Sequence, residues 1–214
     1  MGGIRCIIHG RTIGEFLCFS QIFAFRRGAA LHYPIEYLEK HPSFKLDYYK
    51  CPTKPTGLDG YCDADWGTSD NRRSITGNIF RWYNGAPIAW KSKLQKSVAL
   101  STAEAEYYSA SLGAVEVIYL CQLLRDMGFG PTSPTPVYED NTACIEWTND
   151  VIGGAERAKH IDILKHFALK AAQIGHLRPK RVSTDDQLAD VFTKSLQPAQ
   201  SATIIARLLR RKWQ

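Results

Sequence analysis

The sequence lacks a hydrophobic run long enough to cross a membrane. The apolar stretch Phe16 to Phe25 is interrupted by Gln21 and is shorter than the ~20 residues that a membrane helix needs. No small-residue cleavage pattern clearly follows it, so it does not read as a signal peptide. We therefore expect no membrane segment, no secretion and no membrane partner.

Cysteine pairs spaced for a metal site are also missing. The six cysteines are scattered and none forms a C-x-x-C pair, which argues against a zinc site. Scattered single cysteines are more typical of free thiols in a reducing compartment than of a disulfide framework. The chain also has no internal repeat and no long low-complexity run.

The composition is that of a globular protein with a mild excess of positive charge. Of the 214 residues, 44% are hydrophobic, which allows a full core in one domain, or one domain with appendages. The net charge of +6 is compatible with a polyanionic partner, but a generic basic soluble domain would carry it as well.

The hydrophobic pattern predicts three strands followed by alternating helices and strands. We expect strands at 58–66, 74–83, 86–91, 136–139 and 176–182, and helices at 102–127, 142–149, 160–173 and 185–194. Asn84-Gly85 is a strong two-residue hairpin signal between the second and third strands. This order predicts an α/β fold, with a mixed five-stranded sheet and helices packed on its faces.

Acidic residues gather at the ends of these elements and on the long helix. A hard divalent cation prefers oxygen ligands, and two such ions need several carboxylates that converge on one edge of the sheet. Any one acidic pair alone is more often solvated surface. The clusters are Asp63 and Asp65; Glu104 and Glu106; Glu139 and Asp140; and Asp185, Asp186 and Asp190.

The start of the long helix favours Glu106 over Glu104. Ser101 and Glu104 form a capping box, which gives Glu104 a structural role. Glu106 lies about 200° further around the helix axis. Its face continues through Ala110 and Gly113, small residues that allow close packing on the sheet. We therefore expect Glu106 to point inward.

In the other acidic clusters, local arguments narrow the choice of the metal-binding residue without always reducing it to one. A second capping box begins at Thr184, which puts Asp186 in the first turn of the last predicted helix and makes it our choice, with Asp190 in reserve. On the first strand, period-two alternation places Asp63 and Asp65 on the same face and does not separate them.

Several long sequence motifs contain these acidic residues or lie between them. They are GYCDADW at 60–66, RSITG at 73–77, PIAWKSKLQK at 87–96, VALSTAEAEY at 98–107, YEDN at 138–141, KHID at 159–162 and DQLADVFTK at 186–194. In these motifs, which follow one another in order and at normal spacing over roughly residues 58–196, the chain resembles the ribonuclease H domain of copia-type retrotransposon Pol polyproteins.

The resemblance implies a metal-dependent endonuclease that hydrolyses the RNA strand of RNA–DNA hybrids. It implies that two Mg²⁺ or Mn²⁺ ions are held by Asp63, Glu106, Asp140 and Asp186, which would be both metal-binding and catalytic. It also implies two partners, the RNA–DNA hybrid and the reverse-transcriptase region of the same polyprotein. The expected location is the cytoplasm, within a virus-like particle, with the nucleus as a second site.

The resemblance also implies boundaries between regions of the chain. Residues 1–28 are an unassigned leader, residues 29–57 resemble the end of the reverse-transcriptase region plus a linker, and residues 58–196 form the ribonuclease H domain. Residues 197–214 are expected to be a basic tail. Cellular relatives carry a histidine in the loop before the last helix, whereas this chain has none there, which puts that loop's help in product release in doubt.

Hybrid binding is expected to use backbone phosphates rather than base sequence. The basic residues near the strand ends are Arg72, Arg73, Lys91, Lys93 and Lys96, which could equally be an ordinary solvated face. Two other functions stay open. One is a catalytically silent or domesticated retroelement fragment that binds nucleic acid without cutting it. The other is an integrase of the same fold, although we find no late glutamate with integrase spacing.

Overall fold

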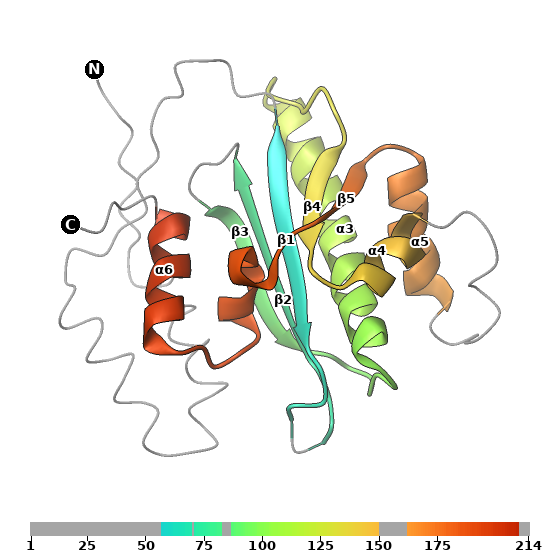
Figure 1. Ribbon diagram of the computed structural model, residues 1–214. Coiled ribbons are helices and arrows are strands. Elements are labelled where there is room, and N and C mark those ends of the chain that lie inside the picture. Colours follow the sequence, from blue (N-terminus) through green and yellow to red (C-terminus); the bar gives the residue numbers. More distant parts are fainter. Residues whose placement is uncertain (1–56, 70, 83–86, 150–161, 210–214) are drawn as a thin grey trace.

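The structure, a computed structural model, describes residues 57–69, 71–82, 87–149 and 162–209 (Figure 1). The strands are β1 (Leu58–Asp65), β2 (Ile75–Trp82), β3 (Pro87–Leu94), β4 (Thr135–Glu139) and β5 (Leu177–Arg181). The helices are α3 (Thr102–Asp126), α4 (Thr142–Asn149), α5 (Asp162–Gln173) and α6 (Pro198–Leu209), with short 3-10 segments η2 (Thr184–Asp186) and η3 (Leu188–Phe192). The expected hairpin at Asn84-Gly85 and all of residues 1–56 lie outside the described residues.

The five strands form one mixed sheet in the order β3-β2-β1-β4-β5. The first three are antiparallel neighbours, whereas β4 lies parallel to both β1 and β5. Strand β1 is therefore central, with β2 on one side and β4 on the other. The predicted α/β class and the mixed five-stranded sheet with flanking helices are confirmed.

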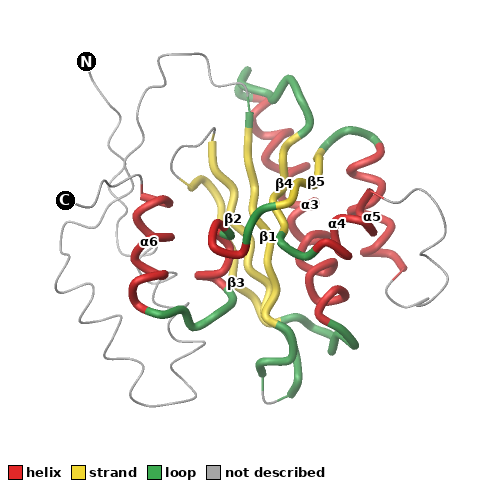
Figure 2. Tube along the Cα trace, in the orientation of Figure 1, coloured by secondary structure: helices red, strands yellow, loops and turns green. Residues whose placement is uncertain are grey.

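Each face of the sheet has its own apolar core, because side chains alternate along the strands. Cys62 and Phe80 point to one face and pack with Val117 of α3 and with α5. Tyr61 and Ile79 point to the other face and pack under η3 and α6. Figure 2 shows α6 on the opposite side of the sheet from α3, α4 and α5.

Helix α3 begins and ends as its sequence predicts. The Ser101 hydroxyl accepts a hydrogen bond from the Glu104 backbone N–H at 3.1 Å, and the Glu104 carboxylate accepts one from the Leu100 N–H at 2.8 Å. At the other end, Gly128 adopts a φ of +79°, which favours glycine, and the Phe129 N–H donates to the Leu124 carbonyl. The cap at Ser101 fixes where the helix starts, and so where Glu106 lies.

The prediction of one regular helix at 185–194 is wrong. Two 3-10 segments stand there instead, and Gln187 between them is extended, with φ −72° and ψ 103°. Its side-chain amide donates to the Cys62 carbonyl at 2.8 Å and its oxygen accepts from the Ala189 N–H at 3.2 Å. These bonds tie the segment to β1 and break the helical periodicity.

The packed unit continues beyond residue 196, the boundary expected from the sequence. Helix α6 places Ile204 and Leu208 in the core under the sheet, with 1% and 3% of their surface exposed. Residues 198–209 therefore belong to the packed unit. Among the described residues, no helix combines the length and apolar character needed to cross a membrane.

A buried ion pair at the start of the sheet gives a testable stability effect. Arg81 on β2 makes two hydrogen bonds to Asp59 on β1, at 3.0 and 2.6 Å, and both residues are 7% exposed. Arg81→Ala is expected to cost about 3 to 5 kcal/mol of unfolding free energy in urea denaturation, because it leaves a buried carboxylate without its partner. A double replacement of Asp59 and Arg81 by Leu should lose less. A double variant no more stable than the single one would contradict this reading.

Candidate metal centre

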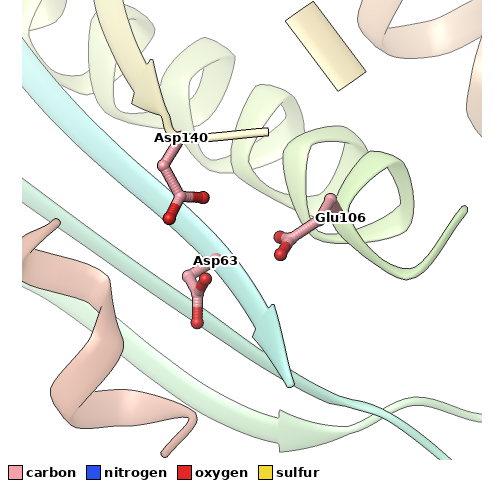
Figure 3. A group of neighbouring side chains, drawn as sticks. All are labelled: Asp63, Glu106 and Asp140. Carbon is pink, nitrogen blue, oxygen red and sulfur yellow. The ribbon is translucent and has the colours of Figure 1, made fainter. Parts of the chain in front are cut away.

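Three carboxylates from separate parts of the chain meet at one edge of the sheet. Asp63 belongs to β1, Glu106 to the first turns of α3, and Asp140 follows the end of β4 (Figure 3). Each offers an oxygen, and these oxygens all lie within 4.8 Å of one another. The structure thus brings together three of the four carboxylates that the sequence singled out.

The topology explains why these residues meet. Strands β1 and β4 are parallel neighbours, with Tyr61 opposite Tyr138, so both run toward the same edge of the sheet. Helix α3 lies very close to β1, since a Cβ on Gly113 would come within 2.5 Å of the Cys62 Sγ. The small residue predicted on this helix face thus lets Glu106 approach Asp63.

Glu106 points inward, as its helical position predicts. It is 6% exposed, and burial raises its pKa well above the usual value, helped by the negative charges of Glu139 and Asp63. Asp63 is fully buried, and burial raises its pKa as well, although the Lys194 ammonium and the Thr193 hydroxyl oppose the shift. Like charges held this close favour either protonation or a bound cation.

Glu139 is a buried carboxylate that our sequence reasoning listed but did not choose. It is 3% exposed, and its Oε1 accepts hydrogen bonds from the backbone N–H groups of Asp140 and Asn141, at 3.1 and 3.3 Å. Burial and the negative charge of Asp63 raise its pKa well above the usual value. The alternation of buried Thr135, Val137 and Glu139 along β4 was the signal that places it inward.

The site has the donor chemistry of a hard divalent cation. Among the residues that the structure describes, no hydrogen-bond donor reaches Glu106 Oε2 or Glu139 Oε2, although both atoms are buried. Buried carboxylate oxygens without a partner are unfavourable unless they are protonated or bind a cation. The oxygen-only group of Asp63, Glu106 and Asp140 matches the ligands that Mg²⁺ and Mn²⁺ prefer.

The structure does not bring Asp186 into this group. Its side chain is 55% exposed and binds the guanidinium of Arg207 on α6 at 2.8 Å, while the Ser183 hydroxyl donates to its other oxygen at 2.8 Å. These contacts lower its pKa. The expectation assumed one regular helix, and the break at Gln187 turns Asp186 away from the site.

Asp190, the residue held in reserve, lies beside Asp63 instead. It is 1% exposed, and the Lys194 ammonium joins the two carboxylates, at 2.9 Å from Asp190 Oδ1 and 3.0 Å from Asp63 Oδ1. Burial, with the charge of Asp63, raises the pKa of Asp190 to about 6. This contact requires η3 to approach β2 at Gly77, where a Cβ would come within 2.6 Å of Thr193 Cγ2.

The loop before η3 also supports the site. The Thr184 hydroxyl donates to Asp140 Oδ2 at 3.0 Å, and so it holds this carboxylate rather than capping a helix. Two residues later, Asp186 anchors the same loop to Arg207. Asp186 and Thr184 therefore lie in one loop, of which only Thr184 contacts the carboxylate group.

The crowded carboxylates predict that removing one charge stabilises the protein when metal is chelated. In EDTA at pH 7.5, Glu106→Gln is expected to raise the melting temperature by about 2 to 4 °C, or about 1 kcal/mol. The native pKa of Glu106 lies above its usual value of 4.5, so the wild type loses stability as pH rises past that value. The advantage of the variant should therefore shrink at pH 5.

The same variant provides its own control with metal. Saturating Mn²⁺ should stabilise the wild type more than Glu106→Gln, because the variant has lost an oxygen donor. Differential scanning fluorimetry at both pH values, with and without Mn²⁺, measures all four cases. A wild type that melts above the variant in EDTA at pH 7.5 would contradict the crowded-charge picture.

The chain is similar in sequence to known Pol polyproteins of plant transposons. The chain is 41% identical over 138 residues to the retrovirus-related Pol polyprotein of transposon TNT 1-94 from Nicotiana tabacum, an alignment that covers 64% of this chain and 10% of that protein. It is 40% identical over 169 residues to that of transposon RE1 from Arabidopsis thaliana, which covers 78% of this chain and 11% of the relative. No family model matches the chain.

A solved structure matches the fold. A ribonuclease H1 isolated from compost by a metagenomic approach superposes with a TM-score of 0.50 at 12% identity, over 64% of this chain and 93% of that one. This chain has the ribonuclease H fold, and its homologues are plant retrotransposon Pol polyproteins. The resemblance to the ribonuclease H domain of retrotransposon Pol polyproteins is thereby confirmed, whereas the copia-type subclass stays a prediction. The chain spans about a tenth of the length of the polyproteins it matches.

The thiols and two aromatic residues of the motifs also have defined environments. The cysteines among the described residues, Cys62, Cys121 and Cys144, are free and buried. Tyr107 is buried in the ribonuclease H core, whereas Trp66 is 47% exposed, with its indole N–H donating to the Ala99 carbonyl. His160, in the KHID motif, lies outside the described residues.

Proposed function

We propose that this chain is an endonuclease that hydrolyses the RNA strand of RNA–DNA hybrids. One observation carries the proposal: oxygens of Asp63, Glu106 and Asp140 converge within 4.8 Å at one edge of a ribonuclease H sheet. Carboxylates collected at such an edge suit phosphodiester chemistry, which needs cations beside the reacting phosphate.

Asp63, Glu106 and Asp140 would hold a divalent ion, Mg²⁺ or Mn²⁺, and Asp190 would complete the set needed for two. Asp190 takes the place given to Asp186 on sequence grounds, because it lies beside Asp63 and is buried. When bound, such ions would activate a water for in-line attack and stabilise charge on the leaving 3′ oxygen, giving 5′-phosphate and 3′-hydroxyl ends.

Residues of the chain itself orient this set. Thr184 fixes one oxygen of Asp140, and the backbone N–H of Asp140 is held by Glu139 Oε1. The Thr193 hydroxyl donates to Asp63 Oδ2. Partners of this kind limit the rotation of carboxylates that would otherwise repel each other, so that the oxygens stay directed at one point.

Exposed lysines of β3 support a contact with the hybrid backbone. Asp63 pairs with Gly77, and Gly77 pairs with Ser92, so the Ser92 backbone lies about 10 Å from that of Asp63 at the usual strand spacing. Lys91 and Lys93 flank Ser92 and are exposed. Their side chains lie on the same face of the sheet as Cys62, the face that carries α3 and Glu106. We assign them to phosphate contacts, which would bind hybrids without reading base sequence.

The polyprotein relatives suggest the biological setting. The proposed role is removal of RNA from hybrids during reverse transcription by a copia-type retroelement, beside the reverse-transcriptase region of the same polyprotein. The proposed location is a cytoplasmic virus-like particle, with access to the nucleus. The homology to Pol polyproteins of plant transposons supports this setting.

The test is cleavage of a labelled RNA–DNA hybrid by the full 214-residue chain in Mg²⁺ or Mn²⁺. We expect cuts in the RNA strand only, no cuts in matched RNA or DNA duplexes, and complete loss in EDTA. Hybrid binding without cleavage in either metal would overturn the nuclease and favour the silent nucleic-acid-binding module. Strand-transfer products with viral-end DNA would favour an integrase.

A further inference from the structure

Lys194 makes the most unusual contact at the proposed metal centre. Its ammonium lies 3.0 Å from Asp63 Oδ1 and 2.9 Å from Asp190 Oδ1, so a single positive charge is shared by two buried carboxylates. Asp63 is fully buried, Asp190 is 1% exposed and the Lys194 side chain is 31% exposed. The lysine therefore reaches from the protein surface into the carboxylate cluster.

Asp63 belongs to two separate groups of charged side chains. Toward α3 and β4, its carboxylate faces Glu106 and Asp140, and these three oxygens lie within 4.8 Å. Toward η3, its Oδ1 faces Asp190 across the Lys194 ammonium. Among the described residues, no cationic side chain lies within hydrogen-bond reach of Glu106 Oε2 in the first group. The second group already holds the ammonium of Lys194.

We propose that Lys194 is an internal counter-ion that holds the cation position between Asp63 and Asp190 and must leave before a divalent ion binds there. This proposal rests on the metal centre of the proposed function. The two positions should then differ in their affinity for a divalent ion. The group of Asp63, Glu106 and Asp140 binds the first ion with Lys194 in place. The second ion binds between Asp63 and Asp190 only in competition with the Lys194 ammonium.

The chemistry of lysine suits this exchange. An ammonium carries a single charge on a flexible four-carbon chain, so it can swing outward through the exposed part of its path without moving the backbone. A divalent ion brings twice the charge and can accept further oxygen ligands from a bound phosphate. Substrate and second ion should therefore displace Lys194 together.

The residues around Lys194 make its departure local. The preceding residue, Thr193, has a hydroxyl that hydrogen-bonds the Asp63 carboxylate and the Asp190 carbonyl. The backbone N–H of Lys194 also donates to the Asp190 carbonyl. These backbone and hydroxyl bonds hold η3 in place independently of the ammonium. Loss of the lysine charge should therefore change cation binding without unfolding η3.

The test is Mn²⁺ binding to the full chain without nucleic acid, followed by electron paramagnetic resonance and isothermal titration calorimetry. The wild type is expected to bind one ion tightly and a second at least about tenfold more weakly. Lys194→Met, which keeps the length of the side chain but not its charge, should strengthen the second site by about tenfold or more. Lys194→Arg should retain the wild-type difference.

Lys170→Met is the matched control, because it removes the same charge from the last turn of α5, where Lys170 is exposed and has no assigned role in binding. It should leave both Mn²⁺ affinities unchanged, and circular dichroism checks that each variant folds. Two equal sites in the wild type, or an unchanged second site in Lys194→Met, would overturn this inference alone. Absence of any tight Mn²⁺ site in the wild type would overturn the proposed metal centre and this inference with it.

Discussion

Replacing Asp63 with Asn is expected to lower the rate of RNA–DNA hybrid cleavage by at least roughly a thousandfold. Replacing a residue that only supports a metal ligand typically lowers activity roughly 10- to 100-fold, and the loss of a ligand itself should be larger. Within the described part of the chain, Asp63 is the one carboxylate that faces Glu106 and Asp140 and also, through Lys194, Asp190. Asparagine keeps the shape of the side chain and an oxygen for the Thr193 hydroxyl. The loss should therefore appear in kcat rather than in folding.

Asp65→Asn is the matched control for this experiment. Asp65 lies on the same face of β1, but it is the last residue of the strand and is only partly buried. Its neutralisation should change the cleavage rate by no more than about fivefold. Equal losses in the two variants would show that charge at this end of the sheet matters, rather than the position of Asp63. A fully active Asp63→Asn variant would refute the site.

Asp190→Asn is expected to reduce hybrid cleavage by at least about a hundredfold, whereas Asp186→Asn should stay within about fivefold of the wild type. Asp190 is buried beside Asp63, and Asp186 is half exposed in an ion pair with Arg207. Steady-state kinetics on one hybrid substrate measures both variants. The reverse ranking would restore Asp186 to the metal centre and would contradict the geometry around η3.

The sequence predicted the parts of the site that depend on local rules. The capping box at Ser101 fixes the start of α3, and a helical rotation from that point turns Glu106 toward the sheet. Gly113 then permits the close contact with Cys62 on β1. Both steps involve residues on one regular helix, so period and side-chain size were enough.

Local rules failed where a distant contact sets the backbone. Gln187 donates to the Cys62 carbonyl, 125 residues away, and this bond breaks the helix expected at 185–194. With that helix intact, Asp186 and Asp190 would share a face. With it broken, one faces solvent and the other faces Asp63.

Alternation along β1 also could not separate Asp63 from Asp65. Both side chains point to one face, and they differ in how deeply they are buried. Burial depends on which elements pack on that face of the sheet. Asp63 pairs with Gly77, where η3 packs against the sheet, so it is covered, whereas Asp65 lies at the end of the strand. Glu139 shows the opposite case, since alternation along β4 does place it inward.

Anomalous diffraction from crystals of the full chain soaked in Mn²⁺ tests the central claim most directly. We predict a manganese peak within coordination distance of oxygens from Asp63, Glu106 and Asp140, and its loss in crystals of the Asp63→Asn variant. A saturating soak that gives no peak among these three carboxylates, while manganese binds elsewhere on the chain, would contradict the account.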